Sequence, residues 1–107
     1  MPEVSERRES KRVPMQFLIA SAEGVWRQIS GDLGLSGVRL DRVSPFDFYP
    51  LTALQLQLDA ELKPRQVTIA IKRYFITNTG VHAAALFEDL DFDTEMAIAR
   101  TIDNHRV

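Results

Sequence analysis

The stretch Leu54-Gln55-Leu56-Gln57-Leu58-Asp59 places three leucines at every second position, between two glutamines and an aspartate. Successive side chains of a β-strand point to opposite faces of the sheet, so this alternation predicts a strand with one buried and one exposed face. The same period resumes in residues 67–76, after a turn at Lys63-Pro64-Arg65. The centre of the chain therefore predicts two neighbouring strands.

The remainder of the chain repeats this pattern. Alternating apolar residues predict four more strands, at residues 15–21, 25–29, 38–43 and 81–87. Gly31 to Gly37 is rich in turn residues, and Ser44 to Pro50 predicts a loop packed against the body by its aromatic side chains. Six strands at hairpin spacing, followed by one terminal helix, predict a mainly β fold, a small six-stranded antiparallel barrel.

Only the C-terminal segment has a helical pattern. Asp91 or Asp93 can serve as the N-cap, and Glu95 favours the positive end of the helix dipole. Met96, Ala99 and Ile102 lie on one face of the predicted helix.

Composition and charge limit the classes of function. The 107 residues are 45% hydrophobic, which fits a single domain, and the absence of cysteine excludes disulfides and cysteine nucleophiles. The longest apolar run, Val81 to Phe87, is far shorter than the roughly 20 residues of a membrane span, and the charged N-terminus has no signal-peptide core. We therefore expect a cytoplasmic protein without membrane insertion. A net charge of −2 argues against binding to a nucleic acid polymer.

Two short clusters carry the candidate site, Arg7-Arg8-Glu9-Ser10-Lys11-Arg12 and residues 32–40, which begin Asp32-Leu33-Gly34. The guanidinium groups of Arg8 and Arg12 can each hold a phosphate or the O6/N7 edge of guanine through paired hydrogen bonds. A carboxylate such as Asp32 can accept hydrogen bonds from guanine N1 and N2. Together the clusters indicate a site for a guanine nucleotide.

These clusters resemble the signature of the PilZ family, RxxxR followed by (D/N)xSxxG. Glu6-Arg7-Arg8-x-x-x-Arg12 supplies the first part and Asp32-x-Gly34-x-x-Gly37 the second, while Phe87-Glu88-Asp89-Leu90 resembles the FxxL element before the family's C-terminal helix. The resemblance covers residues 6 to about 104. It implies a PilZ-like barrel with a C-terminal helix over residues 12–107, a flexible arm over residues 1–11, and cyclic di-GMP as ligand.

Carried over by position, the resemblance assigns ligand-binding roles around the two clusters. Arg8 and Arg12 would bind phosphate and the Hoogsteen edge of guanine, and Asp32 would bind guanine N1 and N2. Arg7 would reach a second phosphate or a second ligand molecule, or remain an ordinary solvated side chain. The residues that would shape the turn are Gly34, which also offers its backbone N–H, and Gly37.

Two positions depart from the family pattern. The signature serine is Gly34 in this chain, so a hydroxyl group is missing, and Ser36 could replace it only if the turn is shifted. The glycine that often precedes the closing phenylalanine by three residues is Ala84. The second departure concerns strand packing more than the ligand.

The resemblance implies a non-enzymatic receptor or adaptor that changes conformation on binding cyclic di-GMP and signals to an unidentified effector protein. The alternative is a degenerate PilZ-like interaction module that does not bind nucleotide. No catalytic motif is apparent in the sequence. Asp89, Asp91 and Asp93 match three calcium-loop positions, but Thr94 and Arg100 occupy positions that need glycine and glutamate, so we expect no metal or cofactor.

Overall fold

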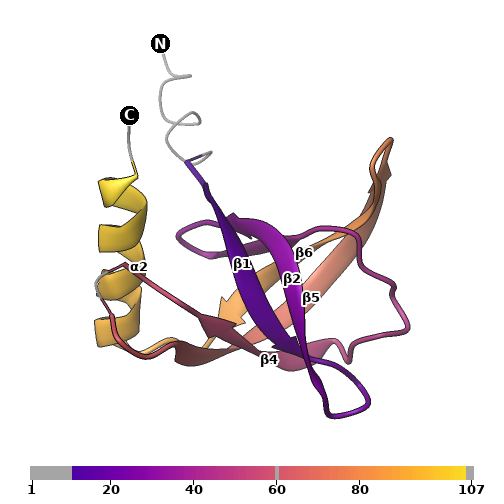
Figure 1. Ribbon diagram of the computed structural model, residues 1–107, viewed down its shortest axis with the longest axis horizontal. Helices are drawn as coiled ribbons and strands as arrows, with labels where there is room; N and C mark the ends of the chain where they lie inside the picture. Colours follow the sequence, from indigo (N-terminus) through magenta and orange to yellow (C-terminus); the bar gives the residue numbers. More distant parts are fainter. Residues whose placement is uncertain (1–10, 60, 106–107) are drawn as a thin grey trace.

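The computed structural model describes residues 11–59 and 61–105 (Figure 1). The predicted flexible arm, residues 1–11, therefore lies outside the described residues except for Lys11, and so do Arg7 and Arg8. The strands and the helix are β1 (Val13–Ala20), β2 (Trp26–Leu33), β3 (Gly37–Leu40), β4 (Leu51–Leu56), β5 (Arg65–Thr77), β6 (Gly80–Glu88) and α2 (Phe92–Asn104).

The strands form a closed antiparallel barrel in the order β1-β2-β3-β6-β5-β4. The predicted six-stranded barrel with a C-terminal helix is confirmed. Strands β5 and β6 pair from Thr68 opposite Glu88 to Thr77 opposite Gly80, and their hairpin projects away from the barrel (Figure 1). The strand ends differ from the prediction by a few residues, because apolar and polar residues no longer alternate where a strand extends beyond the core.

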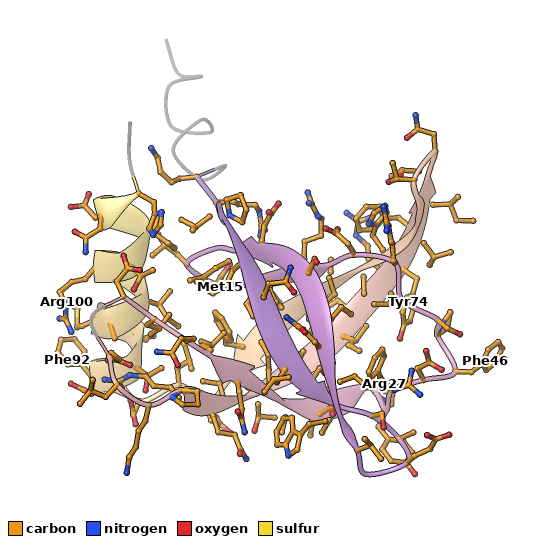
Figure 2. All side chains as sticks on the ribbon, viewed as in Figure 1. Met15, Arg27, Phe46, Tyr74, Phe92 and Arg100 are labelled. Carbon is orange, nitrogen blue, oxygen red and sulfur yellow. The ribbon has the colours of Figure 1, made fainter. Side chains whose placement is uncertain are left out.

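Alternate side chains of the strands fill the barrel with a core of aliphatic and aromatic residues. Phe17, Leu33, Leu54 and Ile69 are almost completely buried. Each such side chain stabilises the fold by roughly 1.5–3 kcal/mol relative to an exposed position. The loop before β4 is packed only in part, since Phe48 is buried but Phe46 is 90% exposed and points away from the body (Figure 2).

Helix α2 lies at one end of the barrel (Figure 1), and its Thr101 hydroxyl accepts a hydrogen bond of 3.4 Å from the backbone N–H of Asp59 after β4. Its N-cap is Asp91, whose Oδ1 accepts a hydrogen bond from the backbone N–H of Thr94 at 2.7 Å. Of the predicted face, Ile102 is buried but Met96 is 40% exposed, and the buried side of the helix includes Ala97 and Ile98 instead. The buried side of the helix includes two threonines, and these polar residues interrupt the apolar pattern that would have marked this side in the sequence. Its residues are Thr94, Ala97, Ile98, Thr101 and Ile102.

The turn predicted at Gly31 to Gly37 is shorter than expected. Strand β2 continues through Asp32 to Leu33, and the turn proper is closed by a hydrogen bond of 2.8 Å from the N–H of Gly34 to the carbonyl of Gly37. Gly31 lies within β2, and glycine is needed there because a Cβ would collide with the carbonyl of Arg39. Its lack of a side chain allows close packing of β2 against β3, so this glycine does not mark a turn.

Candidate ligand-binding site

A groove of about 390 Å³ lies on the outer face of the barrel, over β3, β6 and β5. Its lining contains four cationic side chains and one aromatic ring: Arg12, Arg39, Lys72, Arg73 and Phe75. We call it the basic groove. The turn residues Ser36 and Gly37 line it as well.

Strand register explains how these cations come together. Arg39 of β3 and Arg73 of β5 both pair with Ala84 of β6, which lies between them. Opposite partners in antiparallel strands share one face of the sheet, so both arginines point outward on either side of a methyl group. The alanine that replaces the family's glycine therefore forms part of the groove floor.

An irregularity in β5 adds the remaining cation. The register shifts between Ile71 and Arg73, so that Lys72 has no partner opposite it in β6. Bulges of this kind bend a strand and change where side chains point. As a result Lys72 and Arg73, although consecutive, both line the groove.

Arg12 lies over the turn that carries the second half of the sequence signature. A Cβ added to Gly34 would be 3.2 Å from Nη1 of Arg12 and 3.3 Å from its Cζ. Because Arg12 also lines the groove with Ser36 and Gly37, the structure brings together four of the predicted site residues. Arg7 and Arg8 lie outside the described residues, so their predicted roles remain predictions.

Asp32 is adjacent to the groove but is already engaged. Its Oδ2 forms an ion pair with Nη2 of Arg39 at a distance of 2.9 Å, and its side chain is only 15% exposed. The sequence predicted a carboxylate that could accept hydrogen bonds from guanine N1 and N2. In the structure, one oxygen is taken by an arginine that lines the groove.

Arg39 also has a second carboxylate partner. Its Nε donates to Oδ1 of Asp41 at 3.0 Å, and the same oxygen lies 2.9 Å from Nδ1 of His82. Among the described residues, neither Arg12 nor Lys72 forms an ion pair. Arg73 has no ion pair among these residues either, so three of the four groove cations lack a carboxylate partner there and can attract an anion.

Four groove residues were not predicted from the sequence: Arg39, Lys72, Arg73 and Phe75. Arg39 could have been found, because it occupies an outward position two residues after Gly37 in an alternating strand. Lys72-Arg73 interrupts the alternation between Ile71 and Tyr74, and this was the available signal for a bulge. Nothing local shows that the bulge faces the signature turn, since that contact depends on the strand order.

A separate charged cluster fastens α2 to β5 away from the groove. The guanidinium of Arg65 contacts Glu61 at 2.8 Å, Asp93 at 2.9 Å and the hydroxyl of Thr94 at 3.1 Å. Hydrogen bonding to Arg65 lowers the pKa of Glu61, while hydrogen bonds from Thr94 lower the pKa of Asp91. We assign these groups to helix attachment.

Within the described residues, no helix is long and apolar enough to cross a membrane. The sequence matches no family model and no curated protein. The structure is similar to the crystal structure of the PilZ domain of CeSA from a cellulose-synthesizing bacterium. The two have 18% sequence identity and a TM-score of 0.53, and the match covers 87% of this chain and 91% of that chain. Together with the barrel order and the terminal helix, this similarity shows that the chain has a PilZ-like fold.

Proposed function

We propose that this protein is a non-enzymatic receptor for cyclic di-GMP. The observation that carries the proposal is the convergence of Arg12, Ser36 and Gly37 on one basic groove, with Asp32 next to it. Cyclic di-GMP presents two phosphates and two guanine bases. Guanidinium groups bind phosphate and the O6/N7 edge of guanine, and a carboxylate accepts from N1 and N2.

The ion pair between Asp32 and Arg39 requires an exchange of partners in this proposal. A guanine N–H would replace Arg39 as the partner of Asp32 Oδ2, and the released Arg39 would turn toward a ligand phosphate. Arg39 already lines the groove, so this exchange needs a side-chain movement and no change in the barrel. The half-buried carboxylate keeps a partner before and after binding, which avoids the cost of an unpaired charge.

We propose further that the bound state signals to an effector protein. Ligands shift conformational equilibria by binding one state more tightly than another. The exchange at Asp32 and Arg39 provides two such states of the groove.

The alternative is an interaction module that does not bind nucleotide. It is favoured by the occupied Oδ2 of Asp32 and by glycine in place of the signature serine at position 34. In this case the Asp32–Arg39 pair would be permanent, and the groove would only be part of a protein-binding surface.

Isothermal titration calorimetry distinguishes the two. We expect cyclic di-GMP to bind with micromolar or better affinity and GTP to bind much more weakly. The Arg12→Met variant should lose this affinity, while Arg27→Met is the matched control, because Arg27 pairs with Glu23 and Asp47 and does not line the groove. No heat with saturating cyclic di-GMP would support the alternative.

A further inference from the structure

His82 is a buried polar side chain on the outer face of β6, beside the basic groove. Its side chain is only 8% exposed, and both ring nitrogens have partners. It lies opposite Phe75 of β5, on the part of the hairpin that leaves the barrel. A buried imidazole constrains the orientation of every group that forms a hydrogen bond with it.

One side of the ring faces the groove through a shared carboxylate. Oδ1 of Asp41 accepts from Nδ1 of His82 at 2.9 Å and from Nε of Arg39 at 3.0 Å. An ionised carboxylate only accepts hydrogen bonds, so Nδ1 carries the proton. The two donors compete for one oxygen, and movement of Arg39 therefore changes the hydrogen bond to His82.

The ring also contacts a residue that lines the groove. His82 stacks on Phe75 with a centroid distance of 5.5 Å and an interplanar angle of 27°. The guanidinium of Arg73 lies 5.1 Å from the centroid of the same phenyl ring. Because Phe75 and Arg73 both line the groove, an occupant that contacts them would also affect His82 through the stacked ring of Phe75.

The other ring nitrogen holds the turn of the β5–β6 hairpin. Nε2 of His82 lies 2.7 Å from the hydroxyl of Thr77 and 3.1 Å from that of Thr79. The two hydroxyls are 2.9 Å apart, and the Thr77 hydroxyl accepts from the backbone N–H of Thr79 at 3.1 Å. The direction of these hydrogen bonds thus depends on the state of the imidazole.

We propose that His82 is a positioning residue that couples the basic groove to the turn at residues 78 and 79. The connection runs from Arg39 through Asp41 to His82, and from there to the threonine hydroxyls. When an anionic occupant draws Arg39 away from Asp41, His82 keeps that oxygen alone, and the turn hydrogen bonds rearrange. The hairpin tip, where Ile76 is 81% exposed, is then the surface that reports occupancy of the groove.

The test of the coupling uses the ligand-free protein. NMR of the ring nitrogens of His82 and the backbone amide of Thr79 is recorded for the parent, for Arg39→Met and for the control Arg27→Met. We expect both sets of signals to move in Arg39→Met and to stay in place in Arg27→Met. Asp41→Ala removes the shared acceptor oxygen and should disconnect the pair, so that adding Arg39→Met to it leaves the Thr79 amide unchanged.

Either of two results overturns the coupling. One is a Thr79 amide that does not respond to Arg39→Met. The other is a response that persists in the Asp41→Ala background, since it would then bypass the shared carboxylate. Chemical shifts elsewhere in the barrel check that each variant is folded.

A second arm adds cyclic di-GMP and rests on the proposed function. Substitutions along a coupled network change the coupling by about 2- to 30-fold, and we expect His82→Gln to weaken binding by a factor in this range. Absence of binding to the parent would contradict the proposed function, whereas the coupling is decided by the ligand-free arm. Binding to His82→Gln with parental affinity would overturn the link between His82 and the ligand.

Discussion

The guanidinium of Arg12 occupies the space that a side chain at position 34 would use. A Cβ at Gly34 would be 3.2 Å from Nη1 of Arg12. The backbone at Gly34 is not in the left-handed region, in contrast to Gly24 and Gly80. Glycine is therefore not required at this position by the chain conformation, and its effect is to leave room for Arg12.

We expect Gly34→Ser to strengthen binding of cyclic di-GMP. The new hydroxyl would restore the missing group of the family signature, and one hydrogen bond contributes about 0.5–1.5 kcal/mol net. The neighbouring atoms belong to the far end of a flexible side chain, which can shift to admit the Cβ. Calorimetry gives the affinity, and thermal unfolding should show unchanged stability. Weaker binding at unchanged stability would mean that the serine role does not map to this position.

Truncation of the signature arginines should reduce binding without unfolding the protein. Arg12→Ala and Arg8→Ala should each cost about 1.5–3 kcal/mol of binding free energy, because each removes a hydrogen bond between charged groups. Arg12 is exposed and lies outside the core, so we expect a melting temperature close to that of the parent. Arg27→Ala serves as the control. Parental affinity in both variants would refute the ligand site even though the fold is correct.

The cap of α2 should make stability depend on pH in the acidic range. The pKa of Asp91 lies below its ordinary value of 3.8 because hydrogen bonds from Thr94 favour the charged form. A carboxyl whose pKa is lowered on folding stabilises the protein above the unfolded-state pKa, and this contribution is lost as the pH falls through the folded-state value. Stability should therefore decline below about pH 4, together with the contribution of Glu61, whose pKa is also lowered.

Two substitutions separate the cap from its charge. Asp91→Ala should lower the melting temperature at neutral pH, because the N–H of Thr94 loses its acceptor. Asp91→Asn retains an acceptor and should remain near parental stability at neutral pH while showing a weaker acid dependence. Identical acid dependence in Asp91→Asn and the parent would assign the effect to other carboxyl groups.

The barrel was predictable because its signal is local. Leu54 and Leu56 alternate with polar residues, and this pattern depends only on which face of one strand is buried. The turn around Asp32 was placed incorrectly because Gly31 has the residue type of a turn but serves the approach of β3. That role depends on a neighbouring strand, which the local sequence does not reveal.

The site was only partly predictable for the same reason. Arg12 and Gly37, which line the groove, were predicted from a signature made of two short segments. Lys72 lines the groove because a bulge coincides with the strand order β3-β6-β5, and the engagement of Asp32 by Arg39 follows from their pairing across two strands. Features that depend on segments far apart in the sequence could be identified only from the structure.

Substitutions of Asp32 and Arg39 should have opposite effects on the selectivity of the groove for guanine. Asp32→Ala should weaken binding and also reduce the preference for cyclic di-GMP over cyclic di-AMP, because a carboxylate that faces guanine N1 and N2 penalises a base without those donors. Arg39→Met should also weaken binding, since a phosphate contact is lost. Its effect on selectivity should be opposite, because both oxygens of Asp32 then become available to guanine.

A double-mutant cycle makes the argument quantitative. Residues in direct contact commonly show interaction energies of about 0.5–3 kcal/mol, so the losses from Asp32→Ala and Arg39→Met should not add. Calorimetry with cyclic di-GMP and cyclic di-AMP on the parent, both single variants and the double variant supplies all the terms. Equal losses for the two ligands in Asp32→Ala would show that Asp32 acts only by holding Arg39. The carboxylate would then be part of the structure of the groove, and guanine would have to be recognised by the arginines and the turn.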